Sequence, residues 1–137
     1  MGKLSFNLKD KVFVVTGGSR GIGLEITRML LDQKAKVAIC GRKQDGLDAT
    51  TAELNAGDNL LAVPAHVARP EDVERLFSQT LETFGRLDGL INNVGMNIVS
   101  GLVDADPGLW SKIIDSNLSG TFLCSRKAGQ ILREHKR

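Results

Sequence analysis

The stretch Thr16-Gly17-Gly18-Ser19-Arg20-Gly21-Ile22-Gly23 decides the fold of this chain. It follows a β-branched apolar run, Val12 to Val15, which is typical of a strand covered on both faces. An apolar stripe with helical spacing comes next, at Ile22, Ile26, Met29 and Leu30. Glycines spaced as G-x-x-x-G-x-G between a strand and an amphipathic helix indicate a phosphate-binding turn rather than a plain loop.

Each glycine has a physical task in such a turn. We expect Gly17 to let the chain leave the strand sharply and Gly21 to leave room for a pyrophosphate. Gly23 is expected to bring the helix close to the sheet. The helix N-terminus then offers unpaired N–H groups and a partial positive charge to the phosphates.

Strand and helix patterns alternate along the rest of the chain. Further strands are predicted at Lys36–Cys40, Leu60–Val63 and Leu87–Asn92. A weak helical pattern contains Leu47, Thr51 and Leu54. This β-α order predicts parallel pairing with right-handed crossovers, so the expected fold is α/β.

Two further helices are predicted. The first begins at Pro70 and ends at Gly85, with Val73, Leu76, Phe77, Leu81 and Phe84 as its apolar stripe. The last is a single long helix that starts at Asp106-Pro107 and carries Trp110, Ile113, Ile114, Leu118, Phe122, Ala128, Ile131 and Leu132. Residues 1–137 are therefore expected to form one Rossmann-type, doubly wound parallel sheet, partial, with strands in the order 3-2-1-4 and four helices.

Composition excludes several classes of protein. A formal net charge of +2 gives no reason to expect a nucleic-acid or membrane partner, and no apolar run is long enough to span a bilayer. Cys40 and Cys124 lack a CxxC spacing and are expected to be reduced, buried thiols of a cytoplasmic protein. His66 and His135 have no partner at ligand spacing, so no metal site is predicted.

Four motifs in register resemble the classical short-chain dehydrogenase/reductase family. The turn at 16–23 resembles TGxxxGIG, Asn92-Asn93-Val94-Gly95 resembles NNAG with Val for Ala, and Asn117-Leu118-Ser119-Gly120 resembles NxxG. Ala65-His66-Val67 stands where the family usually has Asp-Val. The resemblance covers residues 8–137 and includes members similar to 3-oxoacyl-(acyl carrier protein) reductases and tropinone reductases.

The resemblance implies a set of cofactor-binding residues. They are Gly17, Ser19, Arg20, Gly21, Ile22 and Gly23 in the turn, and Val67, Asn93, Val94 and Gly95 after the later strands. Asn92 is expected to tie neighbouring strands together. Asn117 belongs to the family's catalytic set, where it bends the helix and holds a water in a proton relay. Its spacing from Ile113 and Ile114 predicts that it faces the core, and a structural hydrogen bond alone would also explain it.

The residues after the second predicted strand indicate NADP(H). Arg42 and Lys43 stand where NAD-binding units carry an acid, and the first carboxylate comes only at Asp45. Arg42 can grip a 2′-phosphate bidentately, with Lys43 and Arg20 adding charge; solvated loop cations are the alternative. His66 replaces an Asp that accepts a hydrogen bond from the adenine amino group. It is expected to accept that bond or stack on the base, unless it is a plain surface histidine.

The family's catalytic Tyr has no counterpart here, because the chain contains no tyrosine. In the family this Tyr acts with a Lys four residues later and an upstream Ser. We therefore interpret the chain as an inactive fragment of a carbonyl/alcohol reductase, a homo-oligomer when intact. A non-catalytic NADP(H)-binding or regulatory module is the alternative. A Rossmann methyltransferase is disfavoured by Arg42-Lys43, where that class needs an acid.

Overall fold

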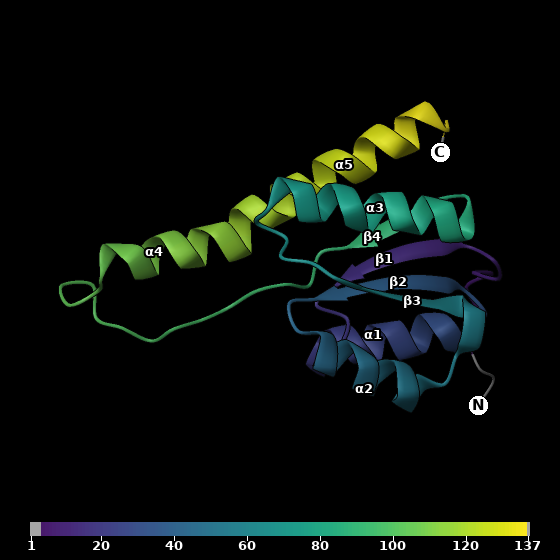
Figure 1. The fold of residues 1–137 in the computed structure, drawn as a ribbon, viewed down its shortest axis with the longest axis horizontal. Coiled ribbons are helices and arrows are strands. Elements are labelled where there is room, and N and C mark those ends of the chain that lie inside the picture. The colour runs from purple at the N-terminus through teal and green to yellow at the C-terminus, as the bar shows by residue number, and fades with distance from the viewer. Residues whose placement is uncertain (1–3, 137) are drawn as a thin grey trace.

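A four-stranded parallel sheet forms the centre of the molecule (Figure 1). The computed structural model describes residues 4–136. The strands are β1 (Val12–Thr16), β2 (Lys36–Gly41), β3 (Leu60–Pro64) and β4 (Gly89–Ile91), in the order β3-β2-β1-β4. The predicted order and parallel pairing are confirmed. The carboxyl ends of the strands point to the left in Figure 1.

β4 is shorter than the predicted strand, because a side chain takes over its first contacts with β1. The Asp88 carboxylate accepts a hydrogen bond from the Val12 N–H at 2.8 Å, and the Asp88 N–H donates to the Val12 carbonyl at 2.8 Å. Arg86 holds the same carboxylate. Burial by itself would raise the pKa of Asp88, but the bonds from Arg86 and Val12 outweigh it and hold that pKa below its ordinary value.

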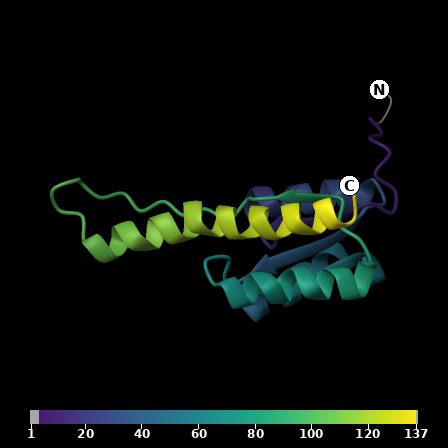
Figure 2. The ribbon, with the colours of Figure 1, turned by 90° about the horizontal axis from the view of Figure 1, so that it is seen from above.

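Helices cover both faces of the sheet. α1 (Gly21–Asp32) and α2 (Gln44–Leu54) lie on one face, and α3 (Pro70–Phe84) and α5 (Gly120–Glu134) lie on the other (Figures 1 and 2). The predicted ends of α3 are confirmed. Pro70 occupies its first turn, and Gly85 adopts a left-handed φ of 75° while its N–H donates to the Leu81 carbonyl at 2.8 Å.

The long helix expected after Asp106 is divided. α4 (Pro107–Ile114) leads into a π-helical segment, Asp115–Ser119, and only then into α5. The Asp106 side chain caps α4 by accepting from the Leu109 N–H at 3.2 Å. A π-bulge adds a residue to one turn and is frequent at functional sites. α4 extends beyond the end of the sheet, on the side of the strands' carboxyl ends (Figure 1).

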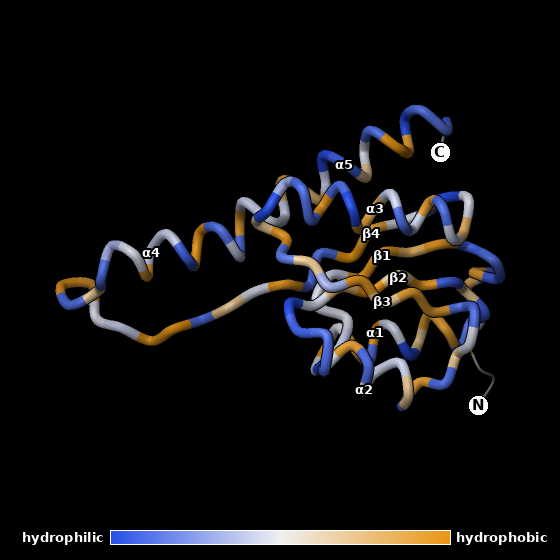
Figure 3. The backbone as a smooth tube through the Cα atoms, viewed as in Figure 1, coloured by the Kyte–Doolittle hydropathy of each residue, from blue (hydrophilic) through white to orange (hydrophobic). Residues whose placement is uncertain are grey.

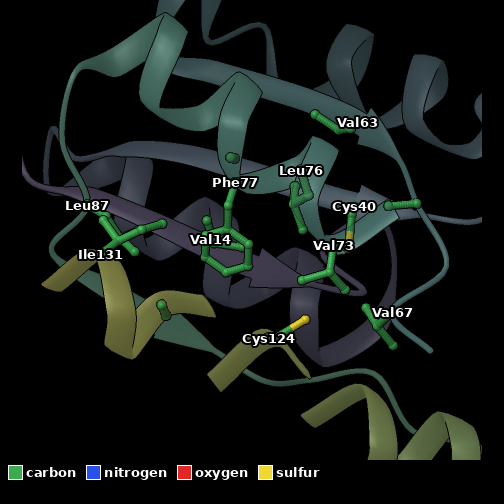
Figure 4. Close-up of a cluster of buried hydrophobic side chains, with 13 residues drawn as sticks. Val14, Cys40, Val63, Val67, Val73, Leu76, Phe77, Leu87, Cys124 and Ile131 are labelled. Carbon is green, nitrogen blue, oxygen red and sulfur yellow. The ribbon is translucent and has the colours of Figure 1, made fainter. Parts of the chain in front are cut away.

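The core has two layers, because side chains of a strand alternate between faces. The layer under α3 and α5 contains Val14, Cys40, Leu76, Phe77 and Cys124 (Figure 4), and the opposite layer contains Val15, Val37, Ile39 and Leu47. Hydrophobic backbone positions accordingly concentrate along the strands (Figure 3). Burial raises the pKa of Cys40 to about 11 and that of Cys124 to about 12, so both buried thiols are protonated.

Several residues predicted to be core are exposed. On α1, Ile22 is 75% exposed and Met29 is 61% exposed, while Gly23 and Thr27 are buried. Thr27 tolerates burial because its hydroxyl donates to the Gly23 carbonyl at 2.8 Å. The buried stripe of α1 is therefore rotated from the predicted one. From α4 to α5, three large apolar side chains are exposed, those of Trp110, Leu118 and Phe122.

We predict that Leu76→Ala lowers the free energy of unfolding by about 2–5 kcal/mol, because the Leu76 side chain on α3 is fully buried against the sheet. Met29→Ala is the matched control and should change it by less than about 0.5 kcal/mol, as expected for an exposed position. Urea titrations followed by circular dichroism measure both. If Met29→Ala lowered the free energy of unfolding as much as Leu76→Ala, Met29 would be a core residue, as the apolar stripe in the sequence predicted.

Candidate functional site

The carboxyl ends of β1 and β4 are joined by one buried hydroxyl. Thr16 is 1% exposed, and its Oγ1 accepts from the N–H groups of Asn93 and Val94 at 3.0 and 3.2 Å. The same hydroxyl donates to the Ile91 carbonyl at 3.5 Å. These bonds fix the segment after β4 beside the glycine turn, so both lie at one edge of the sheet.

The glycine turn is shaped by two different constraints. Gly17 has a φ of 63° and Gly21 a φ of 55°, in the left-handed region that side chains disfavour. A Cβ at Gly21 would meet nothing within 4 Å, so its backbone faces open space. A Cβ at Gly23 would lie 2.1 Å from the Gly17 carbonyl oxygen and 2.4 Å from Nδ2 of Asn93. Gly23 therefore permits the close approach of α1, the turn and the segment after β4.

Within residues 4–136, no carboxylate caps the N-terminus of α1. Arg20 adopts an extended conformation before the helix, its side chain makes no cap hydrogen bond, and the first turn contains no acid. The N–H groups of this turn are thus left for another acceptor, and the helix dipole favours a negative one. Ile22 is exposed beside them. The Ser19 carbonyl accepts from the Thr50 hydroxyl at 2.8 Å, which ties the turn to α2.

The cations that are predicted to bind the 2′-phosphate of the cofactor lie after β2 and in the glycine turn. Arg20, Arg42 and Lys43 are exposed, and within residues 4–136 none of them forms an ion pair. Arg42 lines a cavity of about 660 Å³ that reaches from the segment after β3 to α4. The lining also includes His66, Arg69, Met96, Lys112 and Ser116.

The segment after β3 is held by Asp72 in the first turn of α3. The Asp72 carboxylate accepts from the His66 N–H at 2.7 Å and from Arg75 at 3.0 Å. The His66 hydrogen bond, followed by that of Arg75, holds the pKa of Asp72 below its ordinary value. Val67 is buried against Gly120, where a Cβ would lie 2.4 Å from its Cγ2.

The ring of His66 has one nitrogen engaged. Its Nδ1 accepts from the Ala68 N–H at 3.2 Å, so a neutral ring carries its proton on Nε2. The side chain therefore presents a donor where the family's Asp presents an acceptor. Stacking of this ring on adenine stays a prediction.

The two asparagines after β4 have separate partners. Nδ2 of Asn93 donates to the Gly17 carbonyl at 3.1 Å and closes the turn against the segment after β4. Asn92 was predicted to tie neighbouring strands together, and this prediction is wrong. Its Nδ2 donates to Ser125 Oγ on α5 at 3.0 Å. The reason is that β4 ends at Ile91, so the Asn92 side chain reaches the overlying helix instead. Gly95 is exposed at the start of the following loop.

The spacing of Asn117 from Ile113 and Ile114 predicted that its side chain faces the core, and this prediction is wrong. It is exposed within the π-helical segment, and its amide clamps the loop after β4. Oδ1 accepts from the Met96 N–H at 2.7 Å, and Nδ2 donates to the Met96 carbonyl at 2.8 Å. The π-bulge shifts the helical phase, which is why the spacing from Ile113 and Ile114 misplaced the side chain.

Sequence reasoning missed three residues of this site. Thr16 resembles any other strand end, although Thr before a glycine turn is itself a usable signal. Gly18 was assigned no task, yet a Cβ there would lie 2.5 Å from Ile39 Cγ2 on β2. Arg69 belongs to none of the sequence motifs, and only the folded chain brings it to the cavity that Arg42 also lines. The cofactor contacts of the predicted residues remain predictions.

The fold and this site together define a nucleotide-binding Rossmann domain. Its features are the buried Thr16 hydroxyl, the glycine turn and the uncapped α1 N-terminus, all at the carboxyl ends of parallel strands. The family model described as short chain dehydrogenase matches residues 11–137. This chain belongs to the short chain dehydrogenase family. No helix within residues 4–136 is long and apolar enough to cross a membrane.

Known proteins agree with this assignment. An uncharacterised oxidoreductase of Staphylococcus aureus is 37% identical over 121 residues, which are 88% of this chain and 52% of that protein. A short chain dehydrogenase from Bacillus anthracis superposes with a TM-score of 0.90 at 32% identity, over 93% of this chain and 54% of the other.

A 3-ketoacyl-(acyl-carrier-protein) reductase from Brucella melitensis, complexed with NADH, gives a TM-score of 0.88 at 29% identity, over 93% of this chain and 52% of the other. The chain spans about half the length of the curated relatives it matches.

We predict that Gly23→Ala lowers the free energy of unfolding by at least about 1–3 kcal/mol, because the added methyl group collides with backbone. Gly129→Ala on α5 is the matched control, since a Cβ there meets nothing within 4 Å. The control should gain up to about 1 kcal/mol from helix propensity. Thermal unfolding of the two variants beside the unaltered chain measures both effects. Equal stability of the two variants would contradict the close approach at position 23.

Proposed function

We propose that this chain is the NADP(H)-binding part of an oxidoreductase that transfers a hydride between the cofactor and a carbonyl or alcohol substrate. The observation that carries the proposal is the α1 N-terminus, which has neither a side-chain cap nor an acid and opens beside a glycine with free space. Such a site fits a pyrophosphate. The residues present therefore fit a dinucleotide.

The preference for NADP(H) over NAD(H) rests on charge at the end of β2. Arg42 and Lys43 carry no ion pair within residues 4–136, so their charge is available to a 2′-phosphate. A carboxylate for a ribose 2′-OH is missing at 41–43. The Brucella reductase was solved with NADH, so the family fold alone does not decide between the two cofactors.

The chain's own residues bind and position. A bound nicotinamide cofactor would supply or accept the hydride. Thr16 and Asn93 hold the segment after β4 against the glycine turn, which keeps the floor of the site rigid. Asn117 fixes the Met96 backbone through both of its amide atoms and so sets the course of the loop toward α4. Proton transfer to a substrate oxygen needs a general acid outside this set.

We further propose that the whole protein is a homo-oligomer located in the cytoplasm. The exposed side chains of Trp110, Leu118 and Phe122 along the last helix support an apolar contact with a second copy. In the 137-residue chain β4 stands at an edge of the sheet, where unpaired N–H and carbonyl groups favour self-association of this chain. The two buried, protonated thiols agree with a reducing compartment.

A non-catalytic NADP(H)-binding module is the second candidate, favoured by the absence of tyrosine from the chain. It shares the binding site and differs in having no turnover in any form. The coding region beyond residue 137 separates the two: a YxxxK segment supports the oxidoreductase, and a stop codon supports the module.

We predict that Arg42→Asp weakens NADP+ binding roughly ten- to a hundredfold, because it replaces a charge-assisted bond with repulsion. NAD+ binding should change little, since NAD+ has no 2′-phosphate. Arg126→Asp is the control, with the same change of charge on an exposed position of α5. Calorimetric titrations give the dissociation constants. Equal affinity of the unaltered chain for NADP+ and NAD+ would refute the preference.

We predict that the 137-residue chain by itself has no reductase activity. A positioned general acid contributes about 10²- to 10⁴-fold to such reactions, and the chain has no tyrosine for that role. NADPH oxidation with a panel of ketones tests this, and size-exclusion chromatography beside it tests the expected self-association. Turnover at ordinary enzyme rates by a monomer would overturn both statements.

A further inference from the structure

Three residues from two loops converge where two cavities meet. The larger cavity, of about 660 Å³, and a second one of about 500 Å³ share Arg42, His66 and Arg69 in their linings. Arg42 follows β2, and the other two flank the segment that leads from β3 into α3. Residues common to both linings stand at the junction, so the three side chains border one space.

The positive charge at this junction is only partly offset by the protein. Of the charged groups lining the smaller cavity, Asp72 and Arg75 pair with each other at 3.0 Å, and Arg75 also donates to the Pro64 carbonyl. Within residues 4–136, Arg42 and Arg69 form no ion pair. Asp106 and Asp115 line only the larger cavity, at its α4 side. Neither guanidinium group therefore forms an ion pair, although the charge of the Asp72 carboxylate acts on Arg69 from a longer distance.

The backbone holds Arg69 in place. Its N–H donates to the His66 carbonyl at 2.9 Å, and its own carbonyl accepts from the N–H groups of Asp72 and Val73 at 3.1 Å each. The side chain leaves this fixed corner as an exposed group. His66 adds an N–H donor to the same lining, because its engaged Nδ1 leaves a proton on Nε2.

We propose that Arg69 is a second specificity-determining residue, which with Arg42 and the Nε2–H of His66 binds the 2′-phosphate of NADP(H). The inference rests on the proposed function and extends it to a residue on another loop. A phosphate monoester carries a charge of about −1.5 to −2 at neutral pH and three acceptor oxygens. Two guanidinium groups and one N–H donor match that charge and that number of acceptors.

The test is calorimetric titration of the 137-residue chain with NADP+, NAD+, adenosine 2′-monophosphate and inorganic phosphate. Arg69→Gln should weaken binding of NADP+ and adenosine 2′-monophosphate about tenfold or more, as the loss of a charge-assisted contact predicts. NAD+ affinity should stay within about twofold, because the ligand lacks the anion that the site recognises. Arg126→Gln removes the same charge at an exposed position of α5 that lines neither cavity, and it should leave all four affinities unchanged.

The outcomes separate the two proposals. If the unaltered chain binds NADP+ more tightly than NAD+ and Arg69→Gln keeps the same ratio of the two affinities, the role of Arg69 is overturned and the proposed cofactor stands. Unaltered chain with no preference, or with no binding, overturns the proposed cofactor and the role of Arg69 with it. Inorganic phosphate bound as tightly as adenosine 2′-monophosphate shows a general anion site and also overturns the proposal.

Arg69→Lys and phosphorus NMR guard against a variant that fails to fold. Lys keeps the charge and loses the planar fork, so its NADP+ affinity should fall between those of the unaltered chain and Arg69→Gln. In the unaltered chain, two adjacent guanidinium groups should lower the second pKa of the bound 2′-phosphate below that of free NADP+. An unchanged phosphate titration would contradict the proposal independently of any variant.

Discussion

The close approach of three backbone segments at Gly23 governs this structure. The first turn of α1, the glycine turn and the Asn93 amide meet in a space that a single methyl group would fill, 2.1 Å from the Gly17 oxygen. Asn93 closes the contact by donating to that oxygen, and Thr16 holds the Asn93 backbone from beneath. The α1 N-terminus is aimed at the edge of the sheet because this contact is so short.

The remainder of the site depends on that arrangement. With α1 docked, its uncapped first turn faces the same edge as the ends of β2, β3 and β4. The cations that follow β2 and precede α3 then border shared cavities, and Asp72 secures the second of these loops through the His66 N–H. The hydrogen bonds of Thr16, Asn93 and Asp72 fix the backbone of the site, while the cations without ion pairs stand on the loops after β2 and β3. Such a division is expected when the ligand is an anion that must be exchanged.

Sequence patterns predicted the strands and the ends of α3 from local signals such as β-branched runs, Pro70 and Gly85. The class of fold and the strand order followed from the alternation of strands and helices, because parallel strands are joined by right-handed crossovers. They failed where tertiary contact overrode periodicity. Met29 lies outside the core because Thr27 occupies the buried face of α1, where its hydroxyl donates to the Gly23 carbonyl one turn earlier. Asn117 left the predicted core because a π-bulge changed the phase of its helix. Arg69 is separated from Arg42 by α2, β3 and their connections, so no local pattern could pair them.

A crystal structure of this chain with NADP+ is the decisive measurement of the proposed binding site. We expect the pyrophosphate against the N–H groups of Ile22 and of Gly21, whose backbone faces open space. We expect the 2′-phosphate at the junction bordered by Arg42, His66 and Arg69. Cofactor density at any other surface, with the first turn of α1 left in contact with solvent alone, would refute the proposed site.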